Sequence, residues 1–154
     1  MIAPIPADTP PNAGDLAPTF FLDVEQPDVR GYADALTAGA ADDADRARRI
    51  FAAVRDDIRY DPYRLPTEPA EYRASHTLAA RAGYCVPKAV LLAAVARAAG
   101  IPARLGFADV RNHLQSARLR EQMGTDLFVW HGYGVRWVHG AWRKASPAFN
   151  AELC

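Results

Sequence analysis

Gly83-Tyr84-Cys85-Val86-Pro87-Lys88 is the stretch of this sequence that decides the fold, because a glycine turn there leads directly into a long apolar helix. The run from Val86 to Ala99 is almost unbroken Ala, Val and Leu, which predicts a buried helix. Pro87 falls in its first turn, where the missing N–H of proline is tolerated. Cys85 is therefore expected at the positive end of the helix, where unpaired backbone N–H groups favour thiolate, the nucleophilic form of cysteine. Since free cysteines are also among the most buried residue types, inert packing is the alternative.

The composition indicates one globular domain with no electrostatic preference for nucleic acid or membranes. The 154 residues are 50% hydrophobic, which is enough for one substantial core. Lys plus Arg equal Asp plus Glu at 18 each, so the net charge is zero and gives no long-range attraction to nucleic acid or to an anionic membrane. Two cysteines, Cys85 and Cys154, argue against a disulfide-stabilised secreted domain, and we expect a reducing, cytoplasmic location.

The N-terminal segment differs in composition from the rest of the chain. Residues 1–17 are rich in Pro, Asp and Ala and are expected to form an irregular arm, whereas residues 18–154 are expected to form the single domain. No basic region followed by an apolar stretch marks a signal peptide or an anchor. No run approaches the length of about 18 apolar residues that a transmembrane helix needs. Leu153-Cys154 offers no helix stop, and the sequence leaves open whether the protein extends beyond it.

Hydrophobic periodicity predicts helices in the first part of the chain and strands in the last part. One amphipathic helix, capped by Asp42 or Asp43, is marked by apolar residues at three- and four-residue steps: Ala47, Ile50, Phe51, Val54 and Ile58. The expected helices cover about residues 28–36, 43–59, 75–81, 86–99 and 114–123, and the expected strands cover about 103–110, 127–138 and 141–145. Helices that precede an antiparallel hairpin indicate an α+β fold.

A cysteine nucleophile needs a base, and histidine is the natural choice. Of the four histidines, His131 is favoured because it lies inside a predicted strand, followed by a small glycine that leaves room for a partner. His139 falls in a turn, His113 at a strand end, and His76 on a different local element from Cys85. No histidines have paired ligand spacing and no CxxC is present, so neither a metal site built from Cys85, His131 and another histidine nor any cofactor is expected.

A cysteine at a helix start and a histidine on the following sheet is the arrangement of papain-like thiol enzymes. With these two residues, the segments that carry the resemblance are Gly83-Tyr84-Cys85, Gly100-Ile101-Pro102-Ala103-Arg104 and Trp142-Arg143-Lys144-Ala145-Ser146-Pro147. Over about residues 20–154, the sequence resembles the transglutaminase-like superfamily, and residues 74–154 resemble bacterial members of unassigned substrate. The resemblance implies an α+β papain/transglutaminase-like core, with N-terminal helices and a central Cys-bearing helix packed on an antiparallel sheet.

One position departs from the superfamily pattern. Its usual third catalytic member is an Asp that precedes a Pro, four residues after a Trp, and four residues after Trp142 this chain has Ser146. A serine hydroxyl can orient the His131 imidazole, but it carries no charge to stabilise the imidazolium. Asn150, Asp126 and Asp109 are alternatives for this role, and Ser146 is equally well explained as a turn residue before proline.

The resemblance implies thiol-dependent acyl transfer on a peptide or other amide-containing substrate. Cys85 would attack the carbonyl and His131 would protonate the departing amine, with the backbone N–H of Cys85 as one oxyanion donor. Water as the acceptor makes a peptidase or amidase, whereas an amine makes a transglutaminase. The alternative is a catalytically silent binding module that keeps the fold. The enzyme hypothesis predicts rapid alkylation of Cys85 by iodoacetamide at neutral pH.

Overall fold

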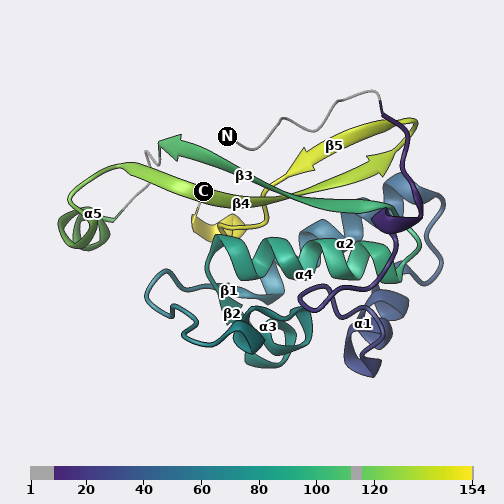
Figure 1. Cartoon of the computed structure of the whole chain (residues 1–154), viewed down its shortest axis with the longest axis horizontal. Coiled ribbons are helices and arrows are strands. Elements are labelled where there is room, and N and C mark those ends of the chain that lie inside the picture. The colour runs from purple at the N-terminus through teal and green to yellow at the C-terminus, as the bar shows by residue number, and fades with distance from the viewer. Residues whose placement is uncertain (1–8, 112–115, 154) are drawn as a thin grey trace.

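The computed structural model describes residues 9–111 and 116–153, in which helices pack against one face of a three-stranded antiparallel sheet (Figure 1). The α-helices are α1 (Pro27–Thr37), α2 (Asp43–Asp57), α3 (Ala74–Ala80), α4 (Cys85–Ala98) and α5 (Ala117–Met123). The strands are β1 (Arg59–Tyr60), β2 (Ala82–Gly83), β3 (Ala103–Arg111), β4 (Leu127–Val138) and β5 (Ala141–Ala145). Short 3₁₀ turns are η1 (Ala13–Asp15), η2 (Pro69–Tyr72) and η3 (Ala151–Leu153). This arrangement confirms the predicted α+β fold.

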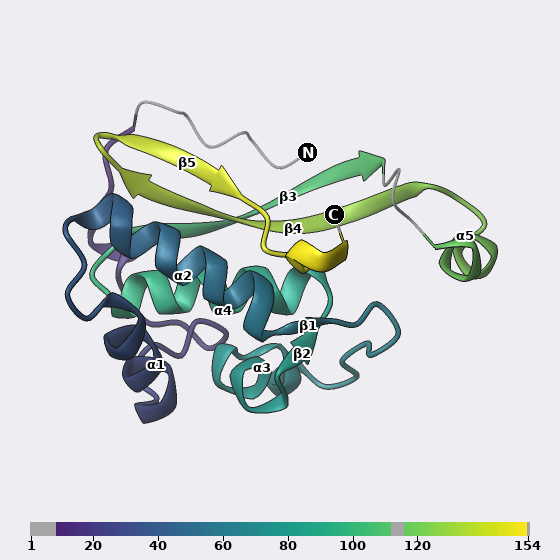
Figure 2. The ribbon, with the colours of Figure 1, turned by 180° about the vertical axis from the view of Figure 1, so that it is seen from behind.

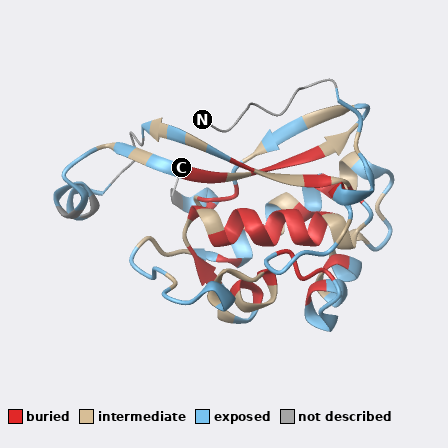
Figure 3. Cartoon of the chain, in the orientation of Figure 1, coloured by how far each residue is buried: buried red, intermediate tan, exposed pale blue. Residues whose placement is uncertain are grey.

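Helix α4 lies at the centre of the molecule, with the sheet on one side of it and α1 and α3 on the other (Figures 1 and 3). Residues 87–96 of this helix are all buried, as its nearly continuous apolar sequence requires. Helix α2 packs beside α4 (Figure 2) and buries the predicted apolar stripe through Ala47, Ile50 and Val54. Within the described residues, no helix is long and apolar enough to cross a membrane.

Strand β4 is the middle strand of the sheet, between β3 and β5. Two of its glycines let it approach α4 closely. A Cβ atom on Gly132 would lie 2.9 Å from the Val86 Cα, and one on Gly134 would lie 2.9 Å from the Leu92 Cδ2. Such contacts are shorter than van der Waals packing allows, so the sheet and the helix can meet here only without side chains at these positions.

A β-bulge interrupts the pairing of β3 with β4. The register shifts between Ala108 and Val110, so that Val129 and Trp130 together stand opposite Asp109. Trp130 has a φ of 57°, a left-handed conformation that is uncommon for a bulky residue. The Asp109 side chain accepts a hydrogen bond from the Trp130 backbone N–H at 3.1 Å and thereby stabilises the bulge.

A second, two-stranded sheet was not predicted from the sequence. Strands β1 and β2 pair in parallel, Arg59 with Ala82 and Tyr60 with Gly83, and so bring the end of α2 next to the turn before Cys85. Each strand is only two residues long, which is too short for any periodicity to reveal.

The outer segments differ in detail from the expectations. Within residues 9–17 of the expected irregular arm, η1 forms one capped turn, closed by the Asn12 and Asp15 side chains. The expected helix at 114–123 is α5, which begins at Ala117, and residues 112–115 lie outside the described part of the chain. The other predicted helices and strands agree with the observed bounds to within two residues.

Candidate active site

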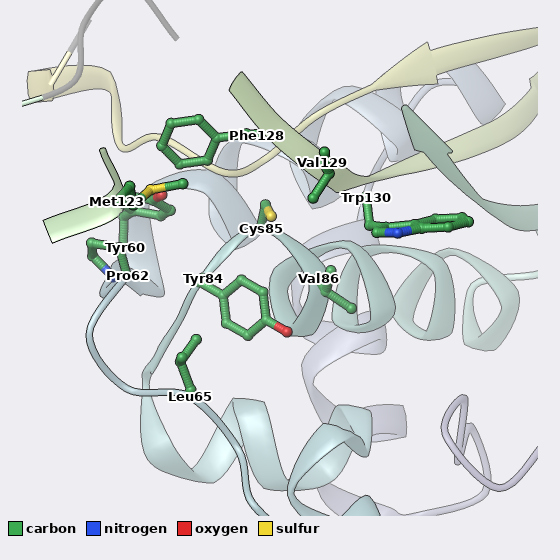
Figure 4. Close-up of a pocket in the computed structure, with 10 residues that line it drawn as sticks. All are labelled: Tyr60, Pro62, Leu65, Tyr84, Cys85, Val86, Met123, Phe128, Val129 and Trp130. Atoms are coloured by element: carbon green, nitrogen blue, oxygen red, sulfur yellow. The ribbon is translucent and has the colours of Figure 1, made fainter. Parts of the chain in front are cut away.

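Cys85 is the first residue of α4, after an N-cap residue, Tyr84, that has extended backbone and no capping side-chain bond. The side chain is 7% exposed and points from the helix toward β4 (Figure 4). The sulfur accepts hydrogen bonds from backbone N–H groups, which lower the pKa of the thiol; the donors are Gly132, Val86 and Cys85 itself. The structure thus confirms the predicted placement at the start of the helix and sets the thiol against the middle strand.

Burial determines the protonation of both candidate catalytic side chains. It raises the pKa of the Cys85 thiol above its ordinary value, because the apolar surroundings outweigh the three backbone donors. It also lowers the pKa of His131. Burial therefore disfavours the charged form of both side chains in the free protein. The backbone N–H groups at the helix start favour the thiolate as expected, but desolvation has the larger effect on the thiol pKa.

His131 lies on β4 opposite Ala108, and its Nε2 is 2.8 Å from the Ser146 Oγ. Ser146 directly follows β5 and precedes Pro147, so the hairpin returns the hydroxyl to the imidazole. Of the four residues left open by the sequence, Ser146 is the one that the structure places in contact with the His131 ring. The Ser146 hydroxyl can fix the orientation of the ring but supplies no negative charge.

The other three candidates are engaged elsewhere. Asp109 supports the β-bulge, and Asp126 accepts a hydrogen bond from the Arg111 guanidinium at 2.8 Å. The Asn150 side chain accepts from the Tyr60 backbone N–H at 2.8 Å and donates to the Ile58 carbonyl at 3.0 Å. The Asn150 side chain thus anchors the chain between α2 and β1, and it does not orient the His131 ring.

Cys85 and His131 lie in adjoining hollows of the surface. His131 immediately precedes Gly132, whose backbone N–H faces the Cys85 sulfur. Cys85 lines one cavity, and His131 and Ser146 line another, each of about 410 Å³. The Phe128 side chain lines both cavities and forms their common wall.

The remaining histidines lie away from these hollows or outside the described residues. His76 lines a small separate hollow beside Glu71, and His139 lies in the β4–β5 turn, 3.8 Å from the Asp42 carboxylate. His113 belongs to the segment that the structure does not describe. Among the described side chains, no three or more His, Cys, Asp and Glu residues group closely enough to hold a metal ion.

Two tyrosines near the thiol were not identified from the sequence. Tyr60 and Tyr84 line the same cavity as Cys85, and burial, aided by the proximity of the thiol, raises the pKa of both phenols. Tyr84 also hydrogen-bonds through its hydroxyl to the Tyr72 hydroxyl at 3.2 Å. Tyr60 reaches the site through the unpredicted β1–β2 pairing, and its aromatic ring packs on Phe149.

Lys88 is a third group that sequence reasoning did not single out. It lies one helical turn after Cys85, is fully buried, and donates through Nζ to the Ile58 carbonyl at 2.6 Å and the Arg55 carbonyl at 2.8 Å. Burial lowers its pKa to about 8. A lysine that begins a long run of Ala, Val and Leu was the available signal, and its ammonium group holds the start of α4 to the end of α2.

Comparison with known proteins now gives the family. The family model described as the transglutaminase-like superfamily matches residues 30–147, which include Cys85, His131 and Ser146. The chain belongs to this superfamily. A comparison with curated proteins gives no significant match.

Solved structures with the same fold include members described as proteases. A candidate cysteine protease from Cytophaga hutchinsonii superposes with a TM-score of 0.68 at 19% identity, covering 87% of this chain and 40% of that one. The periplasmic domain of TgpA from Pseudomonas aeruginosa has a TM-score of 0.55 at 24% identity, covering 79% and 42%. A candidate protease from Parabacteroides distasonis has a TM-score of 0.56 at 19% identity, covering 90% and 27%. This transglutaminase-like chain thus spans less than half the length of each neighbour, and the likeness shows the shared fold.

Proposed function

We propose that this transglutaminase-like domain is a thiol-dependent acyl-transfer enzyme that attacks an amide or peptide carbonyl through Cys85. The observation that carries the proposal is the placement of a cleft-lining cysteine at a helix N-terminus, beside strand β4, whose His131 is hydrogen-bonded to Ser146 after β5. The descriptions of two structural neighbours as candidate proteases support water as the acceptor.

In the proposed mechanism, His131 accepts the Cys85 thiol proton through Nδ1, because Nε2 is engaged with Ser146. The sulfur forms a bond to the carbonyl carbon, and the carbonyl oxygen becomes an oxyanion facing the backbone N–H of Cys85. The C–N bond then breaks as the imidazolium returns its proton to the departing amine. Water, deprotonated by His131, cleaves the resulting thioester and regenerates the thiol.

Two observations favour the second candidate function, a catalytically silent binding module of the same superfamily. Ser146 supplies no charge to an imidazolium, and burial raises the pKa of the Cys85 thiol, so that the reactive ion pair is disfavoured in the free protein. On the enzyme hypothesis, substrate binding and the transition state must offset that cost, since catalytic contacts often tighten only in the complex.

The two functions are separated by assaying hydrolysis of a fluorogenic peptide-amide library, with and without methylamine as a competing acceptor. We expect hydrolysis by the wild type, its loss in Cys85→Ser, a reduction of at least about 10³-fold in His131→Ala, and no change in Cys154→Ser. A methylamide product would show transamidation. Equal rates for the wild type and Cys85→Ser, or no turnover of any library member, would favour the silent module.

A further inference from the structure

The cleft beside Cys85 is lined by a continuous apolar surface. Its walls include Leu65 from the loop after β1, Val86 from α4, Met123 from α5, and Phe128, Val129 and Trp130 from β4 (Figure 4). Of the described side chains that line this cleft, none carries a charge. Its volume of about 410 Å³ falls in the range of about 300–1,000 Å³ that is typical of ligand-binding pockets.

Several of these apolar side chains are exposed to solvent. Leu65 is 63% exposed, Trp130 61% and Val129 59%, and Phe107 extends the surface by packing edge-to-face on Trp130 with ring centroids 6.3 Å apart. Apolar side chains that are exposed together at a cleft are typical of a ligand-binding site.

The position of Trp130 has a structural cause that itself points to binding. The β-bulge and the left-handed φ of 57° place Trp130 at the edge of the cleft, with its indole extending away from Cys85 (Figure 4), although a bulky residue adopts this conformation only at an energetic cost. A regular strand would avoid that cost, so the bulge indicates that an exposed indole at the edge of the cleft is useful to the protein.

We propose that this cleft binds the aromatic or branched aliphatic side chain of the acyl donor, at the residue whose carbonyl Cys85 attacks. Trp130, Phe128 and Leu65 are then the specificity-determining residues. The inference rests on the proposed function and narrows its substrate class. A glutamine or a charged side chain would lose its hydration on entering this apolar surface without gaining a charged partner, so such donors are disfavoured.

Peptidyl chloromethyl ketones that differ only in their last side chain, Phe, Ala or Glu, test the preference without requiring turnover. Alkylation of Cys85 is followed by mass spectrometry, and each rate is divided by the iodoacetamide rate of the same protein. We expect the Phe reagent to exceed the Ala reagent by at least about tenfold and the Glu reagent by about 100-fold. Rates for Phe and Ala within about twofold would overturn the proposal.

Matched variants test whether the preference for the Phe reagent comes from the residues that line the cleft. Trp130→Ala is expected to reduce the Phe-to-Ala ratio at least about fivefold. The control Phe20→Ala removes an aromatic ring that is 56% exposed and does not line the cleft, and it should leave the ratio unchanged. Leu65→Lys places a cation at an exposed cleft position and should raise the relative rate of the Glu reagent. Equal ratios in Trp130→Ala and Phe20→Ala would overturn the assignment.

Matched Phe and Ala peptide amides, assayed in parallel for hydrolysis, distinguish failure of the inference from failure of the proposed function. Selective labelling with selective hydrolysis supports both. Selective labelling without hydrolysis of any amide contradicts the proposed function but supports the apolar preference of the cleft. Hydrolysis with unselective labelling supports the proposed function and overturns the inference.

Discussion

Ser146 occupies the place next to His131 where the usual superfamily carboxylate would stand, and the difference between the two is one negative charge. The hydroxyl lies 2.8 Å from the His131 Nε2 and can hold the ring in place. A carboxylate would in addition stabilise the imidazolium that the proposed transfer of the Cys85 proton creates. In the proposed mechanism, the residue at this position therefore affects how easily a thiolate–imidazolium pair forms.

Ser146→Asp is expected to shift the alkylation of Cys85 to lower pH. In the wild type, burial raises the pKa of the Cys85 thiol, so the iodoacetamide rate should still be climbing above neutral pH. The new carboxylate raises the pKa of His131, which favours the thiolate–imidazolium pair, and the rate at pH 7 should increase about tenfold. The measurement is the pH profile of the alkylation rate, with Gln26→Glu as a control that adds the same charge at an exposed helix start. Superimposable profiles for Ser146→Asp and the control would contradict the role assigned to Ser146.

At the residue scale, the sequence predicted the side chains that a local motif marks. Cys85 was singled out from its glycine turn and apolar helix, and Ser146 from the resemblance to the superfamily, whose pattern places a residue four positions after Trp142. Tyr60 and Lys88 could not be assigned in this way, because their roles come from contacts with segments more than 20 residues away in the chain. Spacing along a chain carries no information on such contacts unless the topology is already known.

At the scale of elements, the site depends on the close contact between α4 and β4. Helices and long strands were predictable because their hydrophobic periods repeat over many residues, and the observed β4 and β5 have the predicted bounds. The close approach itself was not predicted, because a strand glycine is equally consistent with a bulge or a turn.

Gly132→Ala tests this contact. The added Cβ would lie 2.9 Å from the Val86 Cα, and since backbone cannot move aside as a side chain can, β4 and α4 must separate. We expect a loss of about 1–3 kcal/mol in the free energy of unfolding, measured by urea denaturation. The rate of Cys85 alkylation should change as well, because the Gly132 backbone N–H hydrogen-bonds to the thiol sulfur and lowers its pKa.

The matched control for this prediction is Gly31→Ala, in α1. A Cβ on Gly31 would have no atom within 4 Å, and alanine is the better helix former, so this variant should be stabilised by up to about 1 kcal/mol. Equal stability changes in the two variants would show that the contact at Gly132 is not tight.

At the scale of the whole molecule, the described part of the N-terminal segment is tied to the end of α4 that lies farthest from Cys85. Arg104 forms two hydrogen bonds to the Asp15 carboxylate, at 2.6 and 2.7 Å. Arg97, in the last turn of α4, donates to the Ala17 carbonyl at 2.5 Å, and Trp142 donates to the Thr9 carbonyl at 2.7 Å. The segment was expected to be irregular because its composition resists periodic structure, and composition does not reveal such distant ion pairs.

Asp15→Asn is expected to lower the stability of the whole domain in a pH-dependent manner. Hydrogen bonds from the Arg104 guanidinium hold the pKa of Asp15 below its ordinary value of 3.8, so the folded state binds the proton less readily than the unfolded state. The carboxylate therefore contributes stability above the ordinary pKa, and this contribution is lost as the pH falls through the lower folded pKa. At pH 7, the variant should be less stable by about 1.5–3 kcal/mol.

The comparison of wild type and Asp15→Asn is made by urea denaturation from pH 7 to pH 3, and the gap in stability between them should shrink toward the acid end, as the pH approaches the lower folded pKa of Asp15. Asp34→Asn, at an exposed position in α1, provides the control and should stay within about 0.5 kcal/mol of the wild type. Cys85 is the first residue of α4, whereas the segment that holds Asp15 is bound by Arg97 in the last turn of that helix, so the iodoacetamide rate at Cys85 should be the same in the wild type and in both variants. A gap that does not change with pH would show that the stability comes from the shape of the Asp15 side chain and not from its charge.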